Sequence, residues 1–145
     1  KTIREIYTTK AIEDATRLEV NTLSTILFRN NGKGKFTAEP LPLLSQMAPA
    51  MDISLTDINA DGRKDIIIAQ NFNAAQRETG RMNAGLGVIL IAKDDGQFDE
   101  IWPNDSGFFS RADPRRLIAT DLNGDGALEL LLSQNNDKLL LFRSK

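Results

Sequence analysis

The sequence has 145 residues, of which 41% are hydrophobic, enough for one compact domain with a core but too few for two. Its 18 basic and 20 acidic residues give a formal net charge of −2, so no broad positive field is available to bind nucleic acid. Cysteine and histidine are both absent, which excludes disulfides, Cys or His catalysis and nearly all zinc sites. No apolar run approaches the roughly 20 residues that cross a bilayer, so we expect no membrane insertion.

Residues 1–24 form an N-terminal segment outside the repeat region, with one possible short helix. The stretch from Thr9 to Arg17 is the one part of the chain with a helical pattern, and Thr9 is its predicted N-cap. The chain starts at Lys1 without a signal-peptide pattern, so we expect it to be a piece of a longer protein.

Residues 25–145 contain an internal repeat. The segment 53–71 aligns without a gap on the segment 117–135, and the offset is 64 residues because Asp57 corresponds to Asp121. Each copy has an apolar strand, a loop rich in Asp and Asn, and a second short strand rich in Ile or Leu. The second strands run from Asp65 to Gln70 and from Glu129 to Ser133.

Two further segments resemble each other and predict β-hairpins, from Ile26 to Phe36 and from Leu90 to Phe98. In each, an apolar strand meets a cluster of Gly, Asn and Asp, the residues that favour tight reversals of the chain. Four short antiparallel strands per unit are typical of a propeller blade. The sequence therefore predicts an all-β fold of antiparallel four-stranded blades, a partial β-propeller of about two and a half blades that pack on one another, with one short N-terminal helix.

The Asp-rich loops, residues 57–65 and 121–129, have the spacing of a metal site. Side-chain oxygens stand at positions 1, 3, 5 and 9, which are Asp57, Asn59, Asp61 and Asp65 in one loop and Asp121, Asn123, Asp125 and Glu129 in the other. Glycine at position 6 allows a sharp turn, after which the position 7 carbonyl, of Arg63 or Ala127, can face an ion whatever its side chain. Calcium takes six to eight oxygen ligands in a flexible cage, and magnesium tolerates such a cage poorly, so we expect two calcium ions.

The loop pattern has two other interpretations, a polar turn and an EF-hand. Asp, Asn and Gly are common turn formers, so one such loop alone could be a polar turn, but two gap-free copies favour a metal site. An EF-hand begins with the same pattern and needs a bidentate Glu at position 12, where this chain has Ile68 and Leu132. The flanking strands also lack the periodicity of paired helices.

The segments from Leu55 to Asn71 and from Ala119 to Asn135 closely resemble the FG-GAP/VCBS repeats of integrin-like β-propellers, whose motif is Asp-x-Asp/Asn-x-Asp-Gly-x-x-Asp between two strands. The stretch from Phe28 to Phe36 is similar to the hairpin of the same family. The resemblance implies calcium in the inter-strand loops and an extracellular, cell-surface or periplasmic adhesion or recognition module. Glu129 departs from the motif, which has Asp at position 9, and makes the second site the less certain binder.

Three functions from different classes remain open. The first is a non-catalytic, calcium-stabilised scaffold or interaction module with a protein or glycan ligand. The second is a carbohydrate-binding or carbohydrate-active domain, because carboxylates outside the loops could act on a sugar. These are Asp94, Asp95, Asp99, Glu100, Asp105 and Asp113. The third is a purely structural fragment whose partner is the rest of its own propeller. The isolated chain is also expected to self-associate through its exposed blade edges. Trp102 is either a sugar-stacking platform or a core residue, and we favour the core.

Overall fold

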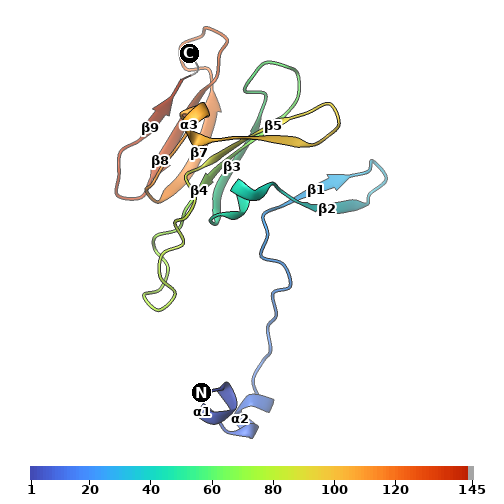
Figure 1. Ribbon diagram of the computed structural model, residues 1–145, viewed down its shortest axis with the longest axis vertical. Helices are drawn as coiled ribbons and strands as arrows, with labels where there is room; N and C mark the ends of the chain where they lie inside the picture. The colour runs from blue at the N-terminus through green and yellow to red at the C-terminus, as the bar shows by residue number, and fades with distance from the viewer. Residues whose placement is uncertain (144–145) are drawn as a thin grey trace.

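The computed structural model describes residues 1–143, and most of its regular structure is antiparallel β-sheet (Figure 1). The helical segments are α1 (Ile3–Ile6), α2 (Thr9–Glu13), the 3-10 helix η1 (Leu43–Gln46) and α3 (Pro103–Ser106). The strands are β1 (Ile26–Asn30), β2 (Phe36–Pro40), β3 (Ala50–Thr56), β4 (Asp65–Gln70), β5 (Val88–Ala92), β6 (Phe98–Ile101), β7 (Pro114–Thr120), β8 (Glu129–Gln134) and β9 (Leu140–Phe142).

The strands form three separate sheets that correspond to propeller-like blades. The first sheet is the hairpin β1-β2, the second has the order β3-β4-β5-β6, and the third has the order β7-β8-β9. The 64-residue repeat extends to fine detail, because the register of β3 on β4 shifts between Ala50 and Asp52 and that of β7 on β8 shifts between Pro114 and Arg116. The all-β class, the two hairpins and both repeated strand pairs are thus as predicted from the sequence.

The second sheet lies between the other two, and the third sheet stacks on it face to face (Figure 1). One core lies between the second and third sheets and consists of Ile67, Ala69, Ile89, Phe108, Leu117, Leu130 and Leu132. The other lies on the opposite face of the second sheet, where Leu27 of β1 packs against a cluster of Leu41, Ile66, Ile68, Val88 and Leu90. Because β4 is covered on both faces, all of its residues are buried, as an uninterrupted apolar strand predicts.

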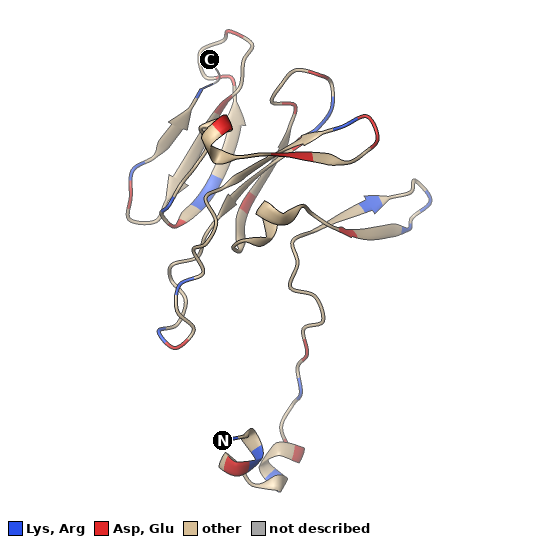
Figure 2. Cartoon of the chain, viewed as in Figure 1, with Lys and Arg blue, Asp and Glu red and all other residues tan. Residues whose placement is uncertain are grey.

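Polar contacts also join neighbouring sheets. Asp52 of β3 accepts a hydrogen bond from the backbone N–H of Leu117 at 2.8 Å, and its carboxylate lies 3.7 Å from Arg116. Arg29 of the first sheet lies over the ring of Phe98 in β6 and donates to the carbonyl of Gly96 in the turn before it. Acidic and basic residues are interspersed along the sheets (Figure 2).

The N-terminal segment extends away from the sheets, and its two short helices contain no buried residue (Figure 1). Helix α2 starts at Thr9, but its N-cap is Thr8, whose hydroxyl accepts from the N–H of Ala11 at 3.3 Å. The helix ends at Glu13, earlier than predicted, and α1 and α3 were not predicted. Trp102, expected in the core, is 60% exposed at the N-terminus of α3, so that prediction was wrong.

Candidate metal-binding loops

The two Asp-rich loops occupy equivalent places in consecutive sheets. The first loop, residues 57–65, connects β3 to β4, and the second loop, residues 121–129, connects β7 to β8. Position 9 of each loop is the first residue of the second strand, β4 or β8. The pairing of that strand therefore fixes the backbone position from which the position 9 side chain extends. Gly62 and Gly126 at position 6 have φ of 88° and 87°, the left-handed conformation that the predicted sharp turn requires.

The first loop is folded around the carboxylates at its positions 1 and 5. Asp57 accepts from the backbone N–H groups of Asp61 at 3.0 Å and Gly62 at 2.7 Å. The Asn59 side chain accepts from the N–H of Asp61 at 3.1 Å and donates to Asp61 Oδ2 at 2.8 Å. Backbone donors that converge on a carboxylate stabilise its charged form and hold the loop in one shape.

Arg63 ties the first loop to the hairpin β5-β6. Its guanidinium lies 2.6 Å from Asp61 Oδ2 and 2.7 Å from Asp94 Oδ1, and its Nε donates to the carbonyl of Ala92 at 2.9 Å. The loop pattern predicts a role for the Arg63 carbonyl and none for its side chain, and the structure adds these three contacts of the side chain. The signal was missed because Asp94 is 31 positions away in the sequence and reaches Arg63 only through the sheet.

The second loop has a similar set of hydrogen bonds and an alanine in place of the arginine. Asp121 accepts from the N–H groups of Gly124 at 2.7 Å and Gly126 at 2.9 Å. The Asn123 Nδ2 lies 2.8 Å from Asp125 Oδ2 and 3.4 Å from Glu129 Oε1, so the side chains at positions 3, 5 and 9 converge. Ala127 at position 7 has no polar side chain to pair with them.

The acidic residues at position 9 are both buried. Asp65 accepts from the N–H of Ile58 in its own loop at 3.0 Å and from the N–H of Ala92 in β5 at 2.8 Å. Glu129 accepts from the N–H of Leu122 at 2.8 Å and lies 3.7 Å from the guanidinium of Arg143. The longer side chain of Glu129 therefore reaches the same backbone position of its loop as Asp65 does, since Ile58 and Leu122 are equivalent residues.

Hydrogen bonds lower the pKa of one carboxyl in each loop below its ordinary value of 3.8. For Asp61 the main cause is the backbone N–H of Arg63, with smaller contributions from Asn59 and the Arg63 guanidinium. For Asp121 it is the backbone N–H of Gly126, followed by those of Gly124, Asn123 and Asp125. Both groups are therefore anionic at neutral pH, as metal ligands must be.

The loops fit calcium in the chemistry of their donor atoms, since every predicted side-chain ligand presents an oxygen. Within residues 1–143, however, no three acidic side chains lie close enough together to hold a metal ion directly. The carboxylates are turned toward backbone N–H groups instead. An ion would therefore have to draw the carboxylates of a loop inward.

The carboxylates outside the loops mostly serve structural contacts. Asp113 is buried and pairs with Arg115 at 2.7 Å, and Asp99 pairs with Lys93 at 3.2 Å. Glu100 accepts from the backbone N–H of Leu44. These partners account for most of the acidic residues that motivated a carbohydrate-active interpretation.

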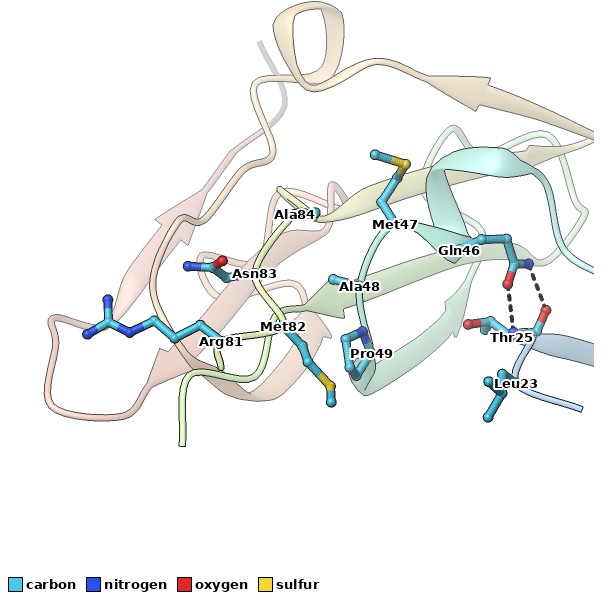
Figure 3. Close-up of a pocket in the computed structure, with 10 residues that line it drawn as sticks. All are labelled: Leu23, Thr25, Gln46, Met47, Ala48, Pro49, Arg81, Met82, Asn83 and Ala84. Atoms are coloured by element: carbon cyan, nitrogen blue, oxygen red, sulfur yellow. Dashed lines mark hydrogen bonds between the residues drawn. The ribbon is translucent and has the colours of Figure 1, made fainter. Parts of the chain in front are cut away.

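A cavity of about 570 Å³ lies between the approach to β1, the segment 46–49 that leads into β3 and the connection 72–86, and no residue of the two loops lines it (Figure 3). Its lining residues are Leu23, Thr25, Gln46, Met47, Ala48, Pro49, Arg81, Met82, Asn83 and Ala84. One wall is the connection 72–86, whose base is a bridge between Phe72 and Met82. The side-chain amide of Gln46 is hydrogen-bonded to the backbone N–H and carbonyl of Thr25, and Arg81 points away from the other lining side chains. The surface that remains inside the cavity is therefore chiefly apolar.

Antiparallel sheets stacked face to face, with an Asp-rich loop after the first strand of consecutive sheets, define a propeller-like repeat protein. Residues 19–68 match the family model of the FG-GAP-like repeat, so this part of the chain is similar to that repeat. The match spans the first sheet, η1, β3, the first loop and β4 as far as Ile68. The second loop lies in the other copy of the repeat, 64 residues later, outside the matched range. The comparisons with curated proteins and with solved structures give no match.

Proposed function

We propose that the chain is a non-catalytic, calcium-binding β-propeller repeat module that acts outside the cytoplasm as a scaffold or interaction domain. The observation that carries the proposal is the gap-free repetition of one oxygen-rich loop, with the same backbone fold, in two stacked sheets. Asp57, Asn59, Asp61, Asp65 and the Arg63 carbonyl would hold one ion. Their counterparts Asp121, Asn123, Asp125, Glu129 and the Ala127 carbonyl would hold the other.

A bound calcium ion would offset two of the three negative charges of each loop, and the chain's own residues would position the loop. The buried position 9 carboxylate connects each loop to the rest of its blade. In the first loop, Asp65 reaches the backbone of β5 at Ala92, so a rigid loop would also brace the hairpin β5-β6. The role of the metal would therefore be to stiffen the repeat.

Calorimetric titration of the purified chain with calcium tests this proposal, and two ions per chain are expected. Asp61→Ala and Asp125→Ala should each lose one ion, whereas Asp105→Ala, an exposed carboxylate outside the loops, should keep both. An ion that binds only the folded state adds about 2.7 kcal/mol at a hundredfold excess over Kd, so the melting temperature should rise with calcium. An unchanged melting curve between chelator and millimolar calcium would contradict the proposal.

The proposed location rests on the family, because FG-GAP-like repeats typically occur in extracellular proteins. None of the helices within residues 1–143 has the length and apolarity needed to cross a membrane.

Carbohydrate recognition is the second candidate, and the exposure of Trp102 favours it. An exposed indole offers a flat apolar surface on which a sugar ring can stack. Because Trp102 is the only tryptophan, its fluorescence reports on this position alone. Titration with a glycan panel should shift that emission, and Trp102→Ala should abolish binding; a flat response would remove this candidate.

A further inference from the structure

A second cavity, of about 390 Å³, lies at the end of the second and third sheets that is opposite to the two Asp-rich loops. Three segments border it: the start of the connection after β4, the residues that lead into β7, and the turn from β8 to β9. We call it the polar cavity. Its polar lining residues are Asn73, Asp113, Asn135, Asn136 and Asp137. All three segments belong to two consecutive sheets of the stack, so the polar cavity is not part of an outer sheet face.

The polar lining is a departure from the internal repeat. Asp113 occupies the place of Pro49, 64 residues earlier, and Pro49 lines the chiefly apolar cavity of Figure 3. The backbone is alike at the two places, because the N–H of Asn135 donates to the carbonyl of Asp113 at 2.8 Å as the N–H of Asn71 donates to that of Pro49 at 3.2 Å. The two cavities therefore share a backbone frame and differ in the chemistry of their side chains.

Asp113 forms the fixed wall of the polar cavity. Its side chain is 7% exposed, and its carboxylate pairs with the guanidinium of Arg115 at 2.7 Å. The same carboxylate accepts from Nδ2 of Asn135 at 3.3 Å and from the backbone N–H of Asn73 at 3.4 Å. Hydrogen bonds to a buried charged group are strong, and these three join the segments that border the cavity. The cavity is therefore preformed.

Other polar groups of the cavity have no partner in the protein. Within residues 1–143, no hydrogen bond engages the side chain of Asn136 or Oδ1 of Asn135, and both residues are exposed. In the same range, Oδ1 of Asn73 is buried and has no hydrogen-bond partner. Buried polar atoms in folded proteins are almost always hydrogen-bonded, so this oxygen points to a donor that the chain does not itself supply.

The free groups of the polar cavity select the chemistry of a ligand. Carboxamides and hydroxyls both donate and accept hydrogen bonds, so three carboxamides around one cavity fit a ligand with several neighbouring hydroxyls. An apolar ligand would find only Ala74 and Ala112. An anion would be repelled by the carboxylate of Asp137, and a cation would compete with Arg115 for that of Asp113.

We propose that the polar cavity is a binding site for the hydroxyl groups of one saccharide unit, with Asn73, Asn135 and Asn136 as its hydrogen-bonding side chains. Asp137 adds an acceptor through the carboxylate oxygen that the N–H of Lys138 does not engage. Asp113 is a positioning residue, because its carboxylate is already bound to three donors. Neither the two Asp-rich loops nor Trp102 line the cavity, so the proposal rests neither on calcium nor on that indole.

Nuclear magnetic resonance titration of the isotope-labelled chain tests the proposal, because the side-chain NH2 groups of asparagine are observed directly. The probes are glucose, galactose, mannose and N-acetylglucosamine, each added at millimolar concentration in the presence of chelator. At least one of these sugars should shift the NH2 resonances of Asn73, Asn135 and Asn136 in a saturable way. Because the titration is made without calcium, its outcome is independent of the calcium proposal.

Asn136→Gly is the first variant, since glycine retains the left-handed φ of 55° while the carboxamide is lost. The Kd for the sugar should rise about tenfold with the fold intact. Asn73→Ala should weaken binding too, but without lowering the free energy of unfolding of the sugar-free chain, because it removes a buried oxygen that has no partner. A side chain with a structural role alone would give the opposite pair of results.

Two control variants should bind the sugar like the unaltered chain. Asn83→Ala removes an exposed carboxamide from the other cavity, and Trp102→Ala removes the exposed indole. The proposal is overturned if no sugar shifts the three NH2 resonances, or if Asn136→Gly and Asn73→Ala bind with unaltered Kd. Loss of binding in Trp102→Ala alone would also overturn it and place the sugar on the indole. So would a blocked dipeptide that shifts these resonances when no sugar does, since the ligand would then be a peptide.

Discussion

Arg63 and Ala127 occupy the same position in two loops that are otherwise alike, and they make the loops electrostatically different. The Arg63 guanidinium is bound to Asp61 at 2.6 Å and already supplies a positive charge where a calcium ion would need that carboxylate. The second loop has Arg143 at 3.7 Å from Glu129, a longer and more exposed contact. The two loops therefore differ in the charge next to position 5, in addition to the difference between Asp65 and Glu129 that the sequence shows.

Arg63→Ala should therefore tighten calcium binding at the first loop. A solvent-screened ion pair is worth up to about 1 kcal/mol, which corresponds to about a fivefold change in Kd. The reciprocal Ala127→Arg should weaken binding at the second loop. Backbone amide resonances of Gly62 and Gly126 report on the two loops separately during titration, since each donates to a position 1 carboxylate.

Lys64→Ala is the matched control for this pair of variants, because it removes the same charge next to Arg63 from a residue with no ion pair within residues 1–143. If Arg63→Ala binds calcium no more tightly than Lys64→Ala, the effect is one of net charge alone and the specific competition for Asp61 is refuted.

The lowered pKa of Asp121 predicts how the calcium-free protein responds to acid. The unfolded chain holds the proton more tightly than the folded chain, so the stabilisation is fully present above about pH 4 and is lost as pH falls through the folded pKa. Asp121→Asn should be less stable than the unaltered chain at neutral pH and should lose less stability on acidification. Urea denaturation between about pH 7 and pH 3 measures both slopes, and Asp105→Asn should match the unaltered chain.

At the scale of elements, Gly87 is required at the start of β5 for two reasons. Its φ is 95°, and a Cβ there would lie 2.9 Å from Cε1 of Phe108, which packs edge to face on Phe142 in the core. Gly87→Ala should destabilise the fold by about 2 to 3 kcal/mol through left-handed strain and overpacking together. Chemical denaturation provides the measurement.

Gly80 separates these two costs. Its φ is 75°, but no atom lies within 4 Å of its would-be Cβ. Gly80→Ala should therefore cost only about 1 kcal/mol, the strain alone. Equal losses in the two variants would show that Phe108 moves aside without cost and that the core around it is looser than the structure indicates.

The sequence predicted the elements that its repeat and its hydrophobic pattern encode. The strand pairs β3-β4 and β7-β8 follow from the gap-free alignment, and β5-β6 follows from its likeness to β1-β2. Strand β9 could not be found in this way, because it follows β8 after a short turn, whereas a long connection, residues 71–87, separates β4 from β5. The repeat alignment therefore places no strand at residues 140–142.

The loops were predicted in backbone and in residue type but not in their long-range contacts. Asp57 and Asp121 fold their own loops through hydrogen bonds within five residues, which a local pattern can encode. The contacts of Arg63 with Asp94 and of Asp65 with Ala92 depend on how the hairpin β5-β6 lies beside the loop. Contacts of this kind require the tertiary structure.

At the scale of the whole molecule, the chain divides into a stack of sheets and an N-terminal segment that contributes nothing to its cores. Every residue of α1 is exposed, and α2 has no buried residue. The match to the FG-GAP-like repeat starts at residue 19, where the chain approaches the first sheet. The polar contacts of Thr25 with Gln46 and with the carbonyl of Ser45 then fix the entry into β1.

Removal of residues 1–18 should therefore leave the free energy of unfolding of the sheets unchanged within about 0.5 kcal/mol. The segment buries almost no apolar surface, and the ion pair that joins it to the retained chain, Arg17 with Glu19, is exposed. Urea denaturation followed by far-ultraviolet circular dichroism compares the free energy of unfolding of the two chains. Removal of residues 1–24 is a second variant to compare, because it also deletes Leu23, which lines the cavity beside the connection 72–86. A loss above about 1 kcal/mol in the shorter deletion would mean that Ile3, Ile6 or Leu18 packs on the sheets in solution, because burial of one such side chain is worth about that much or more.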